Sequence, residues 1–136
     1  MDALLTAIYG KISGSALSSD VGGRVYLDGV PAGCEFPYVV FFIVTGVPDN
    51  VFNKYGEAVI VQFSLFSDST GAAEITDMFN DLTALYDDAQ LTVTGYNMIT
   101  MERQNLMTMV DEIDTGDGTR AVKHWAVDYE AVIARS

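Results

Sequence analysis

One short segment limits the possible folds of this chain more than any other: the uninterrupted apolar run from Tyr38 to Val44. β-branched and aromatic residues dominate it, and no polar residue interrupts it before Thr45, which is typical of a strand buried on both faces. Pro37 suits the first position of such a strand, where a missing N–H matters least. The turn residues within 46–50 then end it. We therefore predict a central strand, covered by the protein's own core or partly by a neighbouring subunit.

Three further segments have the features of long strands, and one of a short strand. Residues 57–66 alternate clearly, with Val59, Val61, Phe63 and Leu65 on one face. Residues 120–134 also alternate, from Trp125 to Ile133, and the Met-rich segment 98–109 is a third long strand candidate. Residues 24–27 predict a short strand.

Two segments have helical periodicity. Apolar residues at helical spacing predict amphipathic helices over residues 2–13 and roughly 72–87, the second capped by Ser69 or Thr70. Residues 14–23 predict a loop, and residues 46–55 and 111–119 predict two more.

These elements define an α+β fold. The economical packing is a mainly antiparallel sheet of about four long strands, formed from two antiparallel pairs, with two helices on one face. No internal repeat or linker divides the chain, so residues 1–136 are expected to form a single domain.

The composition argues for assembly and against binding of anionic ligands. Nineteen Asp and Glu oppose seven Lys and Arg, for a net charge of -12, whereas tight phosphate binding needs clustered cations. Hydrophobic residues make up 49% of the chain and the mean hydropathy is +0.21, so we expect some apolar surface to be buried between subunits.

Targeting signals and membrane spans are not expected. The first residues carry Asp2 and lack a basic region, so we expect no signal peptide and synthesis in the cytoplasm. The run 38–44 is far shorter than the roughly 18 residues that a membrane helix needs, so no membrane association is expected.

Motifs for catalysis are weak. The single histidine, His124, lies within an alternating strand, opposite in direction to Trp125, and is more simply an ordinary sheet residue. Cys34 has no reactive partner nearby, and Glu35 beside it would raise the pKa of its thiol. The glycines of "SSDVGGRVY" belong to no P-loop. We therefore expect no enzyme, no cofactor and no metal site, although a hydrolase using a serine, His124 and an acid remains an alternative.

Two segments leave alternatives open. In "DEIDTGDGT", Asp111, Asp114 and Asp117 do not match the spacing of an EF-hand, so a solvated hairpin loop is favoured over weak ion binding. The Met-rich "YNMITMERQNLMTMV" suits an adaptable contact surface or a plain core strand.

The order of several short motifs resembles a known family. A leading helix, "VGGRVY", a variable loop, "PYVVF", an alternating strand ending in "LFSDS", a helix, and an acidic loop before "HWAVDYEAVIA" are similar to the tail-completion or tail-terminator proteins of long-tailed bacteriophages. The resemblance spans nearly the whole chain.

This resemblance implies a structural virion protein without catalytic residues. Such proteins form rings, typically hexamers, that cap the tail tube and join it to the head connector or neck protein, at the head–tail junction of the virion. If acidic side chains line the ring, genomic DNA would pass through without specific binding. The candidate docking or lumen loop contains Asp111, Glu112, Asp114 and Asp117. Alternatives are another phage neck or tail-tube component, or a small cytosolic binding module.

Overall fold

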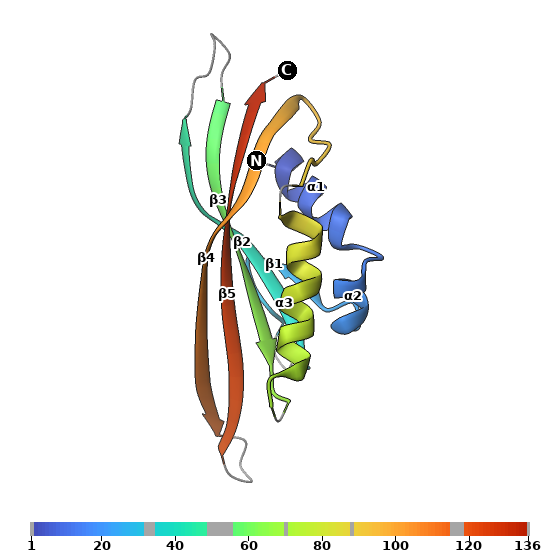
Figure 1. The fold of residues 1–136 in the computed structure, drawn as a ribbon, viewed down its shortest axis with the longest axis vertical. Helices are drawn as coiled ribbons and strands as arrows, with labels where there is room; N and C mark the ends of the chain where they lie inside the picture. Colours follow the sequence, from blue (N-terminus) through green and yellow to red (C-terminus); the bar gives the residue numbers. More distant parts are fainter. Residues whose placement is uncertain are drawn as a thin grey trace.

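The helices all lie on one side of a single curled sheet (Figure 1). The computed structural model describes residues 2–31, 35–48, 56–69, 71–87, 89–114 and 119–135. In chain order the elements are α1 (Asp2–Ile12), α2 (Ala16–Asp20), β1 (Val25–Leu27), β2 (Tyr38–Pro48), β3 (Gly56–Ser67), α3 (Ala73–Tyr86), β4 (Tyr96–Asp114) and β5 (Thr119–Arg135).

The sheet is mixed. Its five strands have the order β1-β2-β3-β5-β4, with β1 parallel to β2 and the other neighbours antiparallel. The α+β class is as predicted, but the sheet is mixed and has five strands, whereas a mainly antiparallel sheet of about four long strands was expected. After β1 the chain returns to the end where it started before entering β2. The Arg24 guanidinium fixes this return by donating to the carbonyls of Pro37 (2.9 Å) and Phe36 (3.3 Å).

The core lies between the sheet and the helices, on the predicted faces. The alternating residues of β3 and the apolar stripe of α3 are completely buried: Val59, Val61, Phe63, Leu65, Ile75, Met78, Leu82 and Tyr86. Alternate residues of β5 from Val127 to Ile133 join the same cluster. The Tyr86 hydroxyl donates to the carbonyl of Ile8 at 2.6 Å, which ties α3 to α1. Periodicity therefore predicted the buried faces of β3, β5 and α3.

The segment predicted as a loop after the first helix contains α2. Five residues are too few to display a helical period, but Ser15 caps the helix by accepting a hydrogen bond from the Ser18 N–H at 3.3 Å. Leu17 and Val21 from this segment are buried in the core. The loop prediction was wrong because tertiary burial outweighs the weak local signal.

The predicted cap of the second long helix is also wrong. Ala72 occupies the N-cap position of α3 and makes no side-chain cap hydrogen bond. The Ser67 hydroxyl instead donates to Glu74 Oε1 at 2.6 Å, in the first turn. Ser69 lies before this turn, and Thr70 lies outside the described residues.

Two strands continue past their predicted ends. β2 extends through Gly46 to Pro48, which pair with Val59 and Glu57 of β3. The register shifts between Ile43 and Thr45, so this extension begins with a bulge. β4 extends to Asp114, beyond the predicted end at Met109. In both cases cross-strand pairing outweighs the turn propensity of glycine, proline and aspartate.

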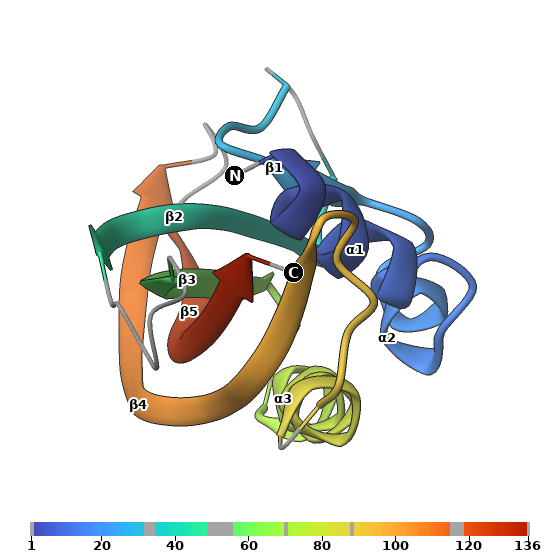
Figure 2. The same ribbon diagram turned by 90° about the horizontal axis from the view of Figure 1, so that it is seen from above.

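β4 curves strongly around the edge of the sheet (Figure 2). Its register with β5 shifts between Met98 and Thr100 and again between Arg103 and Asn105. Such irregularities bend a strand and increase its twist. The second shift separates the part of β4 that contacts the core from the part that leaves it.

Candidate assembly surfaces

The two long hairpins point to opposite ends of the molecule (Figure 1). Gly56, at the start of β3, pairs with Ala134 near the end of β5, whereas Ser67 pairs with Lys123. The β2–β3 connection therefore lies at the end of the sheet opposite the β4–β5 connection. A single subunit can present a hairpin to a different neighbour at each end of its long axis.

The β4–β5 hairpin extends beyond the rest of the sheet. β3 ends opposite Lys123, but β4 and β5 remain paired as far as Asp114 and Thr119. The last rungs of this hairpin therefore have no third strand beside them. They form a two-stranded projection from the body.

The acidic candidate residues lie mostly on this projection rather than in a loop. The backbones of Asp111, Glu112 and Asp114 belong to β4 and pair with Val122, Ala121 and Thr119. Asp117 lies outside the described residues. The alternative of weak ion binding by Asp111, Asp114 and Asp117 therefore stays untested. Of the other predicted loop, 46–55, residues 46–48 belong to β2 and the rest lie outside the described residues.

An uncharged, exposed segment of β4 precedes these acids. We call residues 104–110, "QNLMTMV", the neutral arm. Met107 is 53% exposed and Val110 65%, although Met101, on the same strand, is 1% exposed. Met101 belongs to the core, as a core strand predicts, whereas Met107 lies on the surface; an adaptable contact surface there stays a prediction.

The base of the neutral arm is fastened to α3. Arg103, at the second register shift, lies 3.6 Å from the carboxylate of Asp87, and its guanidinium carbon lies 5.3 Å from the ring centre of Phe79. Asp87 Oδ1 also accepts a hydrogen bond from the Tyr129 hydroxyl at 2.7 Å. The ion pair is exposed and contributes little stability by itself, about 0–1 kcal/mol. Together these contacts join the start of the neutral arm to α3 and β5.

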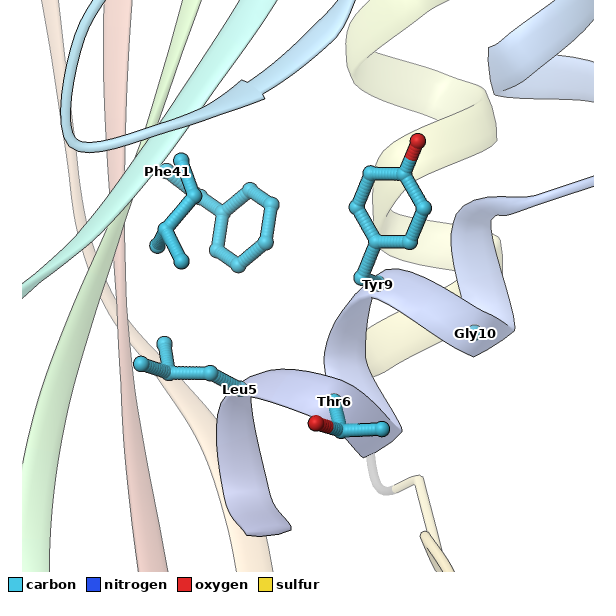
Figure 3. A pocket seen from close by; sticks show the side chains of 6 residues that line it. Leu5, Thr6, Tyr9, Gly10 and Phe41 are labelled. Atoms are coloured by element: carbon cyan, nitrogen blue, oxygen red, sulfur yellow. The ribbon is translucent and has the colours of Figure 1, made fainter. Parts of the chain in front are cut away.

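A second uncharged surface is a pocket beside α1. It has a volume of about 580 Å³ and is lined by Leu5, Thr6, Tyr9, Gly10, Leu27 and Phe41. Figure 3 shows Leu5 and Tyr9 projecting from α1 on the side of Phe41, and the rings of Tyr9 and Phe41 are 6.4 Å apart. Leu5 and Tyr9 were counted in the apolar stripe of the first helix, but Tyr9 is 48% exposed. The apolar face of α1 is therefore wider than the core it covers.

Four acidic side chains gather where α2 meets α3. Burial, a hydrogen bond with Asp81 and the nearby charges of Asp81, Asp77 and Glu74 raise the pKa of Asp20 from 3.8 to about 6. Sequence reasoning missed this contact because it did not predict α2. The Ser15 cap in "SALSSD" was the available signal.

The residues considered for catalysis are not arranged as an active site. His124 lies in β5, its ring stacked on Phe66 with centres 4.2 Å apart, as a sheet residue would be. Cys34 lies outside the described residues. Among the residues that the structure describes, no group of three or more His, Cys, Asp or Glu could hold a metal ion. Within the same residues, no helix combines the length and apolarity needed to cross a bilayer.

Taken together, these features define a small α+β protein with exposed apolar side chains on β4 and beside α1. The particular family follows from comparison: the model of the family described as "Tail completion protein gp17" matches residues 6–134. The chain therefore belongs to this family of phage tail-completion proteins, as the sequence motifs predicted, and is a structural component of the virion tail.

The fold recurs in solved structures. A chain of the "Virion of native gene transfer agent (GTA) particle" is 18% identical with a TM-score of 0.76, over 95% of this chain and 92% of that chain. A second structure is 12% identical with a TM-score of 0.51, over 96% of this chain and 94% of that one. No curated protein matches the sequence. At these identities the structural likeness shows the shared fold.

Proposed function

We propose that several copies of this protein, six in the simplest arrangement, form a ring that caps the finished tail tube and joins it to the head connector. Membership of the tail-completion family, over residues 6–134, is the observation that carries this proposal. The opposite directions of the two hairpins support it, because each subunit has one hairpin for the tail side and one for the head side.

The acidic composition suits passage of DNA. Each copy carries a net charge of -12, and a ring concentrates that charge around its opening. Phosphates are repelled by such a surface, so DNA crosses the junction without being retained. In this proposal the protein contributes no chemical step. Its partners are its own copies, the tail tube protein and a head-connector or neck protein.

Deletion of the protein tests this role. Electron micrographs of particles lacking it should show tails of uncontrolled length, or finished tails separate from DNA-filled heads. Tails of normal length attached to full heads would refute the proposal.

The acidic end of the β4–β5 hairpin gives a sharper test. We expect neutralisation of Asp111, Glu112, Asp114 and Asp117 to Asn or Gln to reduce the number of joined particles, because these residues lie at or beyond the projecting end of β4. Circular dichroism should match the wild type. A control variant neutralises the same number of acids elsewhere: Asp28, Glu35, Asp77 and Glu130. Equal yields of joined particles from the two variants would exclude a docking role for this end.

A further inference from the structure

The exposed apolar side chains of the described residues gather in two places. On the neutral arm they are Leu106, Met107 and Val110, and on the side of α1 and β1 they are Tyr9, Leu27 and Val30, with Val44 at the β2 bulge. Residues 104–110 contain no Asp, Glu, Lys, Arg or His, and neither does the lining of the α1 pocket.

The neutral arm has one feature that protects a free sheet edge, the register shift at its start between Arg103 and Asn105, and lacks the others. β4 is the last strand of the sheet, with β5 on its other side. Natural edge strands usually carry lysine, proline or inward charges that prevent pairing with other chains, and long apolar edges are otherwise covered. Residues 104–108 are all exposed, and no charge or proline interrupts the segment up to Val110. Such an edge is suited to contact with another chain.

The α1 pocket has the shape and chemistry to receive such an edge. Leu5 and Tyr9 extend the apolar face of α1 past the core, and Phe41 forms the floor from β2. Methionine is long, unbranched and adaptable, which suits it to a pocket of irregular outline. Met107, 53% exposed, has this character on the neutral arm.

The strand order places the two surfaces at opposite edges of the molecule. The neutral arm lies on β4, the last strand in one direction, whereas the pocket lies beside β1 and β2 at the other edge. A contact between unlike surfaces of identical copies is heterologous, and it generates a ring when the rotation closes. When two copies meet through one arm and one pocket, one copy still has a free pocket and the other still has a free arm. Further copies can therefore add at both ends until the ring closes.

A second copy can occupy the pocket at little cost if the contact avoids like charges. Two copies that each carry -12 repel one another, and burial of an unpaired acid at their contact would be costly. In the proposed ring, the uncharged surfaces are therefore where identical copies can meet at least cost. We propose that the neutral arm of one copy covers the α1 pocket of the next, with Met107 entering the pocket. This inference rests on the proposed ring and specifies how its subunits join.

Two complementary variants of the full chain test the contact. Met107→Glu places a charge on the arm and leaves the pocket intact, whereas Thr6→Glu places a charge at the pocket and leaves the arm intact. Ala84→Glu adds the same charge on the exposed side of α3 and serves as the control. Native mass spectrometry of the purified proteins at equal concentration reports the assembly state, and circular dichroism reports folding.

The variants should differ from one another in the mass of the assembly that they form. Wild type and Ala84→Glu should give the mass of a ring, and each of the other variants alone should give monomer. An equimolar mixture of Met107→Glu and Thr6→Glu should give a two-subunit species that cannot close, because one functional arm and one functional pocket remain between them. Ring mass from both single variants, or a mixture that stays monomeric, would overturn the contact.

Covalent trapping gives an independent measurement. With Cys34 replaced by serine, the pair Thr6→Cys and Met107→Cys should form disulfide-linked multimers under oxidising conditions. The pair Ala84→Cys and Met107→Cys should not. Monomeric wild type at high concentration, or no trapping by the first pair, contradicts this inference. The proposed function is tested separately by the deletion phenotype, which does not depend on which surfaces join the subunits.

Discussion

Two parts of β4 contain the same residue type in opposite environments. Met101 packs against the helices and is 1% exposed, whereas Met107, six positions further along, is 53% exposed. Between them lies the register shift at Arg103 to Asn105. The comparison teaches that apolar character alone does not locate the core of this protein. The body uses apolar residues for folding, and the neutral arm has them where folding of the single chain gains little.

The largest expected change in stability comes from replacing a buried aromatic residue in the body, and it tests the contrast between the body and the neutral arm. Phe63 is fully buried and its ring lies 4.8 Å from that of Tyr86. Phe63→Ala should lower the free energy of unfolding by about 3–5 kcal/mol, because it removes buried area and leaves a cavity. In dilute protein, Met107→Ala should change the free energy of unfolding by no more than about 0.5 kcal/mol, as substitutions of exposed residues usually do. Urea unfolding measures both, and similar losses would contradict the division.

A smaller effect is expected from a single buried hydroxyl. Tyr86→Phe removes the hydrogen bond between the Tyr86 hydroxyl and the Ile8 carbonyl, which should cost about 0.5–1.5 kcal/mol. Burial also raises the pKa of Tyr86, so its hydroxyl remains a donor across the ordinary pH range. Tyr9→Phe is the matched control, since Tyr9 is half exposed at the pocket. Equal unfolding midpoints for the two variants would show that the α1–α3 hydrogen bond is dispensable.

The smallest effect concerns the contact between α2 and α3. Because the pKa of Asp20 is raised from 3.8 to about 6, the folded state binds more protons than the unfolded state between these values. Its contribution to stability is therefore present below about pH 4 and is lost as the pH rises through about 6. Asp20→Asn should be more stable than wild type at pH 7, with a difference that shrinks towards pH 4.

Unfolding at several pH values measures this difference. Asp28→Asn, at an exposed acid beside β1, is the control for the loss of one carboxylate. A constant difference between Asp20→Asn and wild type from pH 4 to pH 7 would contradict the role of this carboxyl.

α1, α3, β3 and β5 could be predicted from sequence because each has a clear period and a buried face. Val59 to Leu65 alternate because one side of β3 meets the helices, and Ile75 to Tyr86 repeat at helical spacing because one side of α3 meets the sheet. These periods do not show which strands pair with one another or whether they pair in parallel. The parallel pairing of β1 with β2 depends on the Arg24 hydrogen bonds to a distant connection.

The candidate surfaces were predicted less well, for two physical reasons. The acids of residues 111–119 predict a loop, but the pairing of Asp111 with Val122 and Asp114 with Thr119 keeps them in a strand. Tyr9 was counted with the core because it shares the apolar stripe of α1, although the sheet does not cover it. Sequence periodicity reports which face is apolar, whereas only the packed structure shows how much of that face is covered.

The alignment of the strands with the long axis has a mechanical consequence. β3 and β5 run side by side from Gly56 opposite Ala134 to Ser67 opposite Lys123, and their hydrogen bonds lie across the strands. Tension applied between the two ends of the subunit would therefore shear many of these bonds at once instead of peeling them one by one. A subunit held at one end and pulled at the other would resist that load with its whole central strand pair.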